Sequence, residues 1–132
     1  MGNIRFTVFT PTFNRRELIG RVYESLLAQT FSAFEWLVVD DGSTDGTAGR
    51  IAQWAQSAPF PILYISQHHQ GKHRAYNKAL ASARGDFFTV LDSDDAIVPK
   101  ALERLLFHWY SIPRRERRRY SGVTCLCMEA PC

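Results

Sequence analysis

A run of apolar and β-branched residues that ends in a cluster of acids limits the folds open to this sequence. The run spans Phe87 to Leu91 without polar alternation, which predicts a strand covered on both faces of a sheet. Asp92, Asp94 and Asp95 follow at once. Asp92 and Asp94 lean to the same side in extended backbone, and carboxylate oxygens suit Mg²⁺ and Mn²⁺. The stretch therefore predicts either a divalent-cation site at a strand end or a solvated acidic turn before the next helix.

Segments with strand-like and helix-like patterns alternate along the chain. A segment with helical spacing of apolar residues follows each of the first four strand-like runs. Such alternation is typical of an α/β, Rossmann-like fold with three layers, in which helices cover both faces of a mainly parallel sheet. The strands are expected at residues 4–10, 34–39, 62–65, 87–91 and 123–128.

Capping residues set the expected starts of two helices. Asn14 and Glu17 form a capping-box pattern, so the first helix is expected to start at Asn14 and to run to about Gln29. Ser43 or Thr44 is expected to cap the second helix. Both helices should therefore follow closely on the first two strands.

The charge of the chain is unevenly distributed. The 132 residues are enough for one domain, and their formal net charge is +3. Five arginines and one glutamate stand at residues 114–119, so the rest of the chain is close to neutral. A nucleic-acid groove is therefore not indicated. The arginine run is interpreted as a solvated helix end or loop, with contact to acidic phospholipid as the alternative.

The sequence also carries information about location and redox chemistry. It has no apolar run long enough to span a bilayer, and its first nine residues lack a signal-peptide core, so we expect a cytoplasmic location, with the inner face of the membrane as a place of peripheral contact.

Cys125, Cys127 and Cys132 are odd in number and have no Cys-x-x-Cys spacing. They are interpreted as reduced core residues.

Three of the expected strands end in unusual polar chemistry. The segments are Pro11–Arg15, Asp40–Ser43 and Asp92–Asp95, and the loop at Gly71-Lys72 follows the third expected strand. Ligands of open α/β sheets bind beyond the carboxyl ends of the strands, where the strand order reverses. The convergence of these segments predicts a nucleotide site.

Taken as a set, the motifs resemble those of a known family. They are Thr-Pro-Thr-Phe-Asn-Arg at residues 10–15, the segments at 25–31 and 34–35, Val-Asp-Asp-Gly-Ser-Thr-Asp-Gly-Thr at 39–47, Gly71 with residues 74–80, and Leu-Asp-Ser-Asp-Asp at 91–95. In this order, over about residues 4–110, they resemble the N-terminal, nucleotide-binding half of a glycosyltransferase family 2 enzyme with the GT-A fold. The resemblance implies one nucleotide-sugar-binding domain at residues 1–132, truncated before the acceptor-binding half.

The resemblance assigns roles by position. Phe13 would lie against the base, Asp41 would bind a uracil-type edge, and Asp40 would brace the loop. In the Asp-x-Asp motif, the first acid, Asp92, would face the ribose or sugar, and the last acid, Asp94, would hold the metal. Asp95 would be a weaker ligand, and Lys72 or Arg74 would meet the base or the diphosphate. The implied metal ligands are Asp94 and Asp92, and the implied nucleotide-sugar site comprises Pro11, Thr12, Phe13, Arg15, Asp41, Gly71, Lys72, Arg74, Asp92, Ser93 and Asp94.

The implied reaction is transfer of a sugar from a nucleotide-diphosphate sugar to a hydroxyl of a glycan, lipid or other acceptor. The expected donor is a UDP-sugar. The reaction would use Mn²⁺ or Mg²⁺, and it would invert the configuration with a carboxylate base that is expected beyond Cys132. The alternative is a nucleotide-sugar-binding half-domain without transfer activity. A second copy of the chain is a further expected partner, because the missing half would leave apolar surface.

Three rival interpretations fit less well. An EF-hand loop starting at Asp41 would need Glu at its twelfth position, where Ala52 stands. A haloacid-dehalogenase-type phosphatase would need Thr or Val at Ala96, and a dinucleotide dehydrogenase would need Gly-x-Gly-x-x-Gly after the first strand. His69 and His73 are four residues apart, but Gly71 between them predicts a polar loop in place of a helical metal site.

Overall fold

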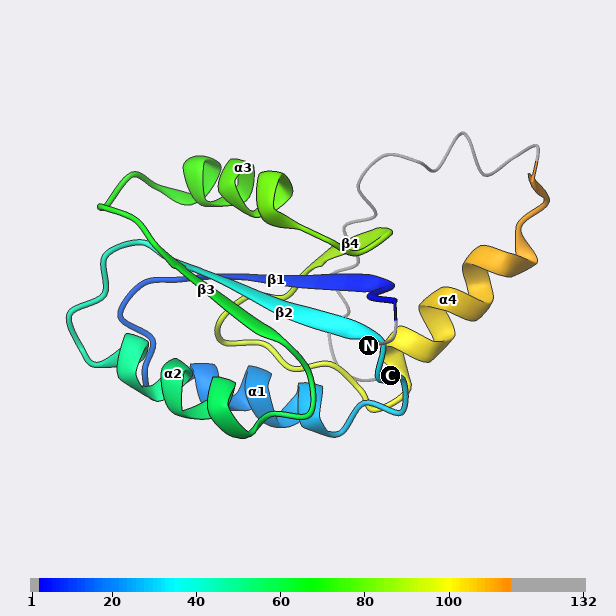
Figure 1. The fold of residues 1–132 in the computed structure, drawn as a ribbon, viewed down its shortest axis with the longest axis horizontal. Coiled ribbons are helices and arrows are strands. Elements are labelled where there is room, and N and C mark those ends of the chain that lie inside the picture. Colours follow the sequence, from blue (N-terminus) through cyan, green and yellow to red (C-terminus); the bar gives the residue numbers. More distant parts are fainter. Residues whose placement is uncertain (1–2, 115–132) are drawn as a thin grey trace.

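The computed structural model describes residues 3–114, in which four strands alternate with four helices (Figure 1). The strand predicted at residues 123–128, the three cysteines and the arginines at 115–119 lie outside the described residues. No helix within residues 3–114 is long and apolar enough to cross a membrane. The elements are β1 (Phe6–Thr12), α1 (Ile19–Leu27), β2 (Phe34–Asp40), α2 (Thr47–Ser57), β3 (Ile62–Ser66), α3 (Lys72–Ser82), β4 (Phe87–Val90) and α4 (Ala101–Ser111).

The four strands form one parallel sheet in the order β3-β2-β1-β4. Thr12 of β1 aligns with Asp40 of β2, which aligns with Ser66 of β3. On the other side of β1, Phe9 aligns with Val90 of β4. The carboxyl ends of the strands therefore lie along one edge of the sheet, and the polar segments that follow them leave from this edge.

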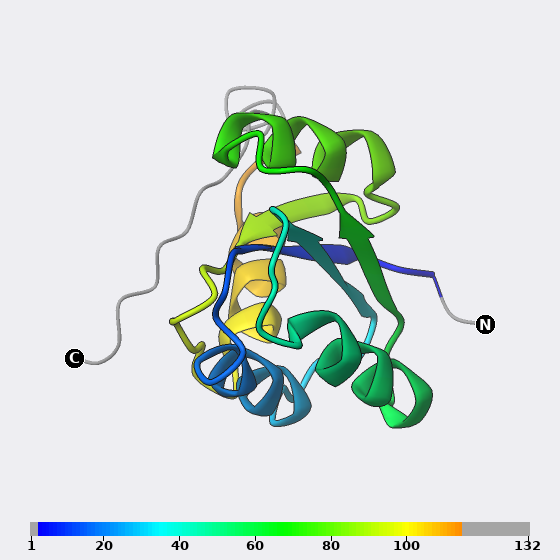
Figure 2. The ribbon, with the colours of Figure 1, turned by 90° about the vertical axis from the view of Figure 1, so that its left-hand side faces the viewer.

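Helices cover both faces of the sheet. Among the described helices, α3 covers one face, whereas α1, α2 and α4 lie on the other (Figures 1 and 2). Parallel strands need such crossover connections, because the chain leaves each strand at the carboxyl edge of the sheet and must return to the opposite edge before the next strand begins. The predicted three-layer α/β/α architecture is confirmed.

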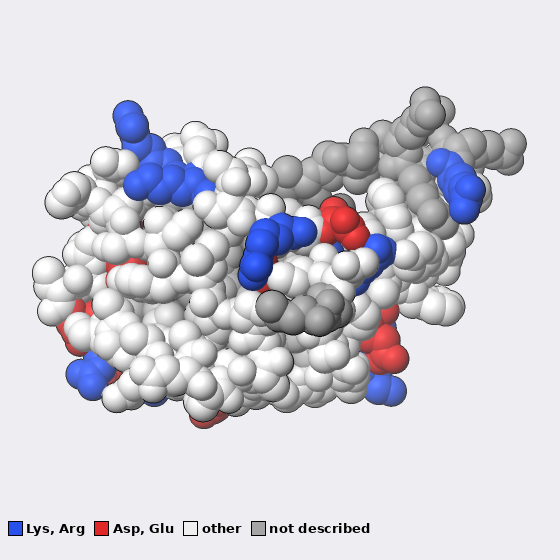
Figure 3. Space-filling model, viewed as in Figure 1, with Lys and Arg blue, Asp and Glu red and all other residues white. Residues whose placement is uncertain are grey.

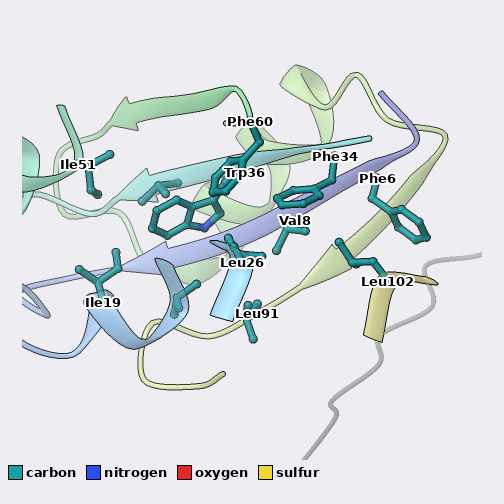
Figure 4. Packing of buried hydrophobic residues seen from close by; sticks show 12 residues of the cluster. Phe6, Val8, Ile19, Leu26, Phe34, Trp36, Ile51, Phe60, Leu91 and Leu102 are labelled. Atoms are coloured by element: carbon teal, nitrogen blue, oxygen red, sulfur yellow. The ribbon is translucent and has the colours of Figure 1, made fainter. Parts of the chain in front are cut away.

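Two apolar clusters flank the sheet, and β2 contributes to both. All seven residues of β2 are buried. Phe34, Trp36 and Val38 pack into the larger cluster with side chains of α1, α2 and α4 (Figure 4). Leu37 and Val39 point to the opposite face and pack against α3. The central strand is therefore fixed from both sides, and so is the polar loop that follows it.

The strand β4 differs from its prediction. Its residues are half-buried throughout, whereas a strand covered on both faces was predicted. Within residues 3–114 its one partner is β1, so it forms an edge of the described sheet. The apolar run predicts a strand correctly, but composition cannot distinguish an edge from a centre, because that position depends on strand order.

The start of α1 also differs from its prediction. Asn14 has a left-handed backbone (φ 50°), and its Oδ1 accepts a hydrogen bond from the backbone N–H of Thr44 at 2.8 Å. It therefore does not cap the helix, which begins at Ile19 and ends at Leu27. Asn tolerates this conformation better than most residues, and its short amide serves the neighbouring loop.

Gly46 is the N-cap of α2, in place of the predicted Ser43 or Thr44, and the side chain of Asp45 just before it contacts the first helical residue. Oδ1 of Asp45 accepts from the backbone N–H of Thr47 at 3.2 Å and from the Thr47 hydroxyl at 2.5 Å. The hydrogen bond from the Thr47 hydroxyl is the main reason that the pKa of Asp45 lies below its usual value. Ser43 is used differently, since its Oγ accepts from the backbone N–H of Asn14.

A buried carboxylate fixes the turn between α3 and β4. Glu35 has no exposed surface, and its carboxylate accepts from the hydroxyl of Thr7 and from the backbone N–H and Nε of Arg84, each at 2.8 Å. The Thr7 hydroxyl in turn accepts from the N–H of Gly85 at 3.0 Å. Buried charge is tolerated only when it is paired and hydrogen-bonded, and these contacts meet that condition. They hold the start of β4 against β1 and β2.

Candidate functional site

A groove of about 270 Å³ lies at the carboxyl edge of the sheet. This volume is close to the lower end of the range for small-molecule sites, roughly 300–1,000 Å³. Nine of the eleven predicted site residues line the groove, and Val39 and Ala75 join them. The lining residues are Pro11, Thr12, Phe13, Arg15, Val39, Asp41, Lys72, Ala75, Asp92, Ser93 and Asp94.

Two predicted site residues do not line the groove. Gly71 lies just behind it and donates its backbone N–H to the carboxylate of Asp41. Its φ of 88° belongs to the left-handed region that favours glycine, and it directly precedes α3. Arg74 is exposed on α3, so of the predicted pair Lys72 and Arg74 the structure brings Lys72 to the groove. Figure 3 shows Lys and Arg atoms at the end of the molecule where α3 begins.

Two groove residues were not predicted from the sequence. Val39 is the last apolar residue of β2 before its acids, and Ala75 lies in the first turn of α3. Both also belong to the smaller apolar cluster. The helical spacing of Ala75 and Ala79 indicated a buried face, but it carried no signal that one end of this face borders a groove.

The loops after β1 and β2 are interlocked. The backbone N–H of Asn14 donates to Ser43 Oγ at 2.8 Å, and that of Arg16 donates to Asp45 Oδ2 at 3.0 Å. The N–H of Asp41 donates to the carbonyl of Thr12 at 2.9 Å. These contacts span two loops that are about thirty residues apart in sequence, and they fix the rim of the groove before any ligand arrives.

Asp40 braces the loop after β2, as the resemblance implies. Its carboxylate is buried and accepts from the backbone N–H of Ser43 at 2.9 Å and from the hydroxyl of Tyr64. Burial raises the pKa of Tyr64, and the hydrogen bond to Asp40 raises it further. Tyr64 therefore stays a neutral donor, and Asp40 is engaged away from the groove.

Asp41 has a more crowded environment. Its Oδ1 accepts from Gln67 Nε2 at 2.8 Å and from the N–H of Gln70 at 2.7 Å, while Gly71 N–H lies 3.3 Å from Oδ1 and 3.2 Å from Oδ2. His69 Nδ1 lies 3.0 Å from Oδ2. Burial alone would raise the pKa of Asp41, but the hydrogen bonds and the charge of His69 together lower it. Asp41 is therefore a fixed anion at the groove, with Oδ1 fully used by the loop after β3.

Phe13 stands at the rim of the groove, on the loop after β1. Its side chain is 43% exposed, and its ring centroid lies 4.8 Å from that of His69. An exposed aromatic ring beside a groove is a suitable stacking surface for a nucleobase. His69 was predicted to lie in a polar loop without a metal site, and in the structure it contacts both Phe13 and Asp41.

The acidic cluster lies on the β4 side of the groove. Asp92, Ser93 and Asp94 line it directly after the strand. Within residues 3–114 no group of three or more His, Cys, Asp or Glu side chains is arranged to hold a metal ion. Two carboxylates nevertheless fit Mg²⁺ or Mn²⁺, because such ions commonly take one or two carboxylates and complete their shell with phosphate oxygens and water. Asp94 and Asp92 are the residues that would hold the ion.

The family model described as Glycosyl transferase family 2 matches residues 7–115. The chain belongs to glycosyltransferase family 2. The match includes residues of every element from β1 to α4, and the resemblance of the motifs to this family is confirmed.

Individual glycosyltransferases and solved structures are also similar to the chain. An uncharacterized glycosyltransferase of Nostoc sp. is 37% identical over 103 residues, which is 78% of this chain and 32% of that protein. Staphylococcus aureus TarS 1-349 in complex with UDP-GlcNAc has a TM-score of 0.76 at 30% identity, covering 81% of this chain and 31% of that one. The mannosyltransferase PcManGT of Pyrobaculum calidifontis, in complex with GDP-Man and Mn²⁺, has a TM-score of 0.74 at 28% identity, covering 85% and 34%.

These relatives are much longer than this chain, which spans about a third of the length of each of the three. The GT-A fold implied by the motifs is confirmed by the two solved structures.

Proposed function

We propose that residues 1–132 form the donor site of a glycosyltransferase, and that this site binds a nucleotide-diphosphate sugar in the groove described above. The observation that carries the proposal is the convergence of three motif-bearing strand ends on one groove. Membership of glycosyltransferase family 2 supports it, as do neighbours solved with UDP-GlcNAc and with GDP-Man.

The state of Asp41 favours uridine as the nucleoside. Oδ1 of Asp41 accepts from Gln67 and Gln70, whereas Oδ2 has the Gly71 N–H that it shares with Oδ1 and the contact with His69, so Oδ2 is the oxygen with room for a ligand donor. Uracil presents a single imide N–H, which needs one acceptor, whereas guanine presents two adjacent donors that fit a carboxylate with both oxygens free. Phe13 at the rim supplies the stacking surface, and Pro11 and Thr12 form the wall beside it.

The diphosphate is proposed to lie between the basic and the acidic sides of the groove. Arg15 and Lys72 supply positive charge, and Lys72 is also the first residue of α3, where the helix dipole favours anions. Asp94 and Asp92 would hold Mn²⁺ or Mg²⁺ on the other side, with Ser93 between them. When bound, this ion supplies charge neutralisation for the departing diphosphate.

Transfer would take the sugar to an acceptor hydroxyl with inversion of configuration. A carboxylate base for that hydroxyl is expected beyond Cys132, and the acceptor is proposed to be a glycan, a lipid or another hydroxyl compound. A cytoplasmic location, at the inner face of the membrane, is part of the same proposal. The second candidate function, for these 132 residues taken by themselves, is nucleotide-sugar binding without transfer.

Calorimetry with a panel of nucleotides tests the donor proposal. With Mn²⁺ present, UDP is expected to bind at least tenfold, or ~1.4 kcal/mol, more tightly than ADP, GDP or CDP. Asp41→Ala should reduce the preference for uridine while the affinity for inorganic diphosphate changes little. Equal affinity for all four nucleotides would contradict the base assignment, and absence of any nucleotide binding would contradict the donor site.

Transfer activity separates the two candidate functions. Residues 1–132 are expected to bind UDP-sugar with metal but to transfer sugar at a rate lower by at least roughly 10²–10⁴-fold than a full-length relative, the contribution of a general base. The measurement is product formation by mass spectrometry with a panel of acceptors, alongside donor hydrolysis. Rapid transfer to a defined acceptor would show that the base lies within these residues, and Asp45, Asp95, Glu103 and Glu129 would be the carboxylates to replace.

A further inference from the structure

The acceptor atom of Asp41 that remains for a ligand is already in contact with a side chain of the protein. His69 Nδ1 lies 3.0 Å from Oδ2, and the side chain of His69 is 70% exposed whereas that of Asp41 is 13% exposed. The same ring rests 4.8 Å from the ring of Phe13. An exposed side chain therefore lies against the two surfaces that are proposed to receive the base.

Gln67 and the backbone of the loop prevent Asp41 from turning to escape this contact. Gln67 is 5% exposed, and its Nε2 donates both to Asp41 Oδ1 at 2.8 Å and to the carbonyl of Gly71 at 3.3 Å. The N–H of Gln70 adds a bond of 2.7 Å to the same oxygen. With Oδ1 held by a buried amide and a backbone N–H, an entering base has to meet Asp41 at Oδ2.

We infer that His69 competes with the nucleobase for Oδ2 of Asp41: it covers this oxygen in the empty groove and swings out into solvent when a base N–H takes its place. This inference rests on the proposed donor site. His69 thereby lowers the affinity for the donor by competition, and it takes no part in the chemistry of transfer.

The competition depends on the charge of His69. Histidine side chains change charge between pH 5 and 8, and a positive charge on the ring adds Coulombic attraction to the hydrogen bond that the Asp41 carboxylate accepts. Protonation therefore strengthens the contact that the base must displace, so binding is coupled to proton release and affinity falls as the pH falls. Hydrogen bonds keep the pKa of Asp41 below its usual value, so Asp41 stays ionised throughout this range.

Within residues 3–114, the titratable group in direct contact with the His69 side chain is Asp41, from the loop after β2. The ring of Phe13, from the loop after β1, is neutral. His68 and Lys72 belong to the same loop and helix start as His69 itself. His68 and His73 are both exposed, which makes them matched controls for a histidine that lacks the contact with Asp41.

The test is calorimetry of a UDP-sugar with Mn²⁺ between pH 5.5 and 8, because a nucleotide sugar has no phosphate that titrates in this range, unlike free UDP. Wild-type affinity is expected to fall about two- to fivefold from pH 8 to 5.5, because an ion pair of an exposed side chain is screened by solvent. His69→Asn and His69→Ala should show a flat profile and bind more tightly than wild type at pH 5.5. His68→Asn and His73→Asn should keep the wild-type profile.

Two results would overturn the inference alone. One is the same pH profile in wild type and His69→Ala, and the other is weaker binding by His69→Ala at every pH, which would make His69 a favourable contact. Uridine gives a second measurement, since it lacks the diphosphate and the metal and should show the same dependence on His69. If no variant binds nucleotide at any pH, the donor site itself is wrong and the inference falls with it.

Discussion

Asp94→Ala is expected to abolish most of the gain in nucleotide affinity that Mn²⁺ gives the wild-type chain. Loss of a residue that merely supports a metal ligand costs roughly 10–100-fold in metal affinity, so loss of a proposed direct ligand should cost about 100-fold or more. With Asp92 as the one carboxylate left on the acidic side of the groove, a single side chain there would hold the ion to the protein. The measurement is calorimetry of UDP at a series of Mn²⁺ concentrations.

Neighbouring acids provide the controls for this prediction. Asp92→Ala should lose part of the Mn²⁺ effect, because its carboxylate lines the same side of the groove. Asp95→Ala should retain most of it, because Asp95 does not line the groove, although its N–H donates to the carbonyl of Asp92 at 3.0 Å. The same Mn²⁺ gain in wild type and Asp94→Ala would rule out Asp94 as the ligand. In the absence of metal, all three variants should bind UDP at least as well as wild type, since each removes a negative charge.

Gly85→Ala is expected to destabilise the fold by about 3 kcal/mol. A Cβ at this position would lie 2.5 Å from the backbone N of Thr7 and 2.6 Å from the carbonyl carbon of Phe6. Both atoms belong to the main chain of the central sheet, so neither can move aside without separating β4 from β1. The Glu35–Thr7–Arg84 contacts would be strained by the same displacement. Urea denaturation measures the change as a shift in midpoint at constant slope.

Gly49→Ala is the matched control. Gly49 lies within α2, and nothing stands within 4 Å of a Cβ built there. Alanine should therefore stabilise the helix by roughly 0.5–1 kcal/mol through its better helix propensity. Opposite signs for the two glycines are the expected result. If Gly85→Ala were as stable as wild type, the close approach of the α3–β4 turn to β1 would be wrong, and with it the restraint on the position of the acidic cluster.

Most of the candidate site could be predicted from the sequence because its residues directly follow strands. A parallel sheet places the carboxyl ends of its strands at one edge, so Thr12, Asp41 and Asp92 were expected to meet there, and they line one groove. Arg74 shows where this reasoning stops. Its motif position implied a ligand contact, but the direction of a side chain on a helix depends on how the helix is rotated against the sheet, and packing of Ala75 and Ala79 sets that rotation.

Local signals misplaced the polar residues of the loops for a similar reason. Residues of the types that commonly cap helices stand in both loops, namely Asn14, Ser43 and Thr44. Each was therefore predicted to cap the helix that follows its own loop. In the folded chain Asn14 and Ser43 instead form hydrogen bonds with the neighbouring loop, and Gly46 is the N-cap of α2. The partner about thirty residues away becomes available only when the β1 and β2 ends are side by side.

The sequence by itself determined the fold class, the order in which strands and helices follow one another along the chain, and the segments that form the groove. Hydrophobic period and strand-end chemistry are local properties of the sequence. Only the tertiary structure decided that β4 lies at an edge of the described sheet, that Lys72 and not Arg74 reaches the groove, and that Gln67, His69 and Gln70 surround Asp41. These outcomes depend on strand order, helix rotation and contacts between distant loops. Each of them is fixed by packing of the whole domain, which no short stretch of residues encodes.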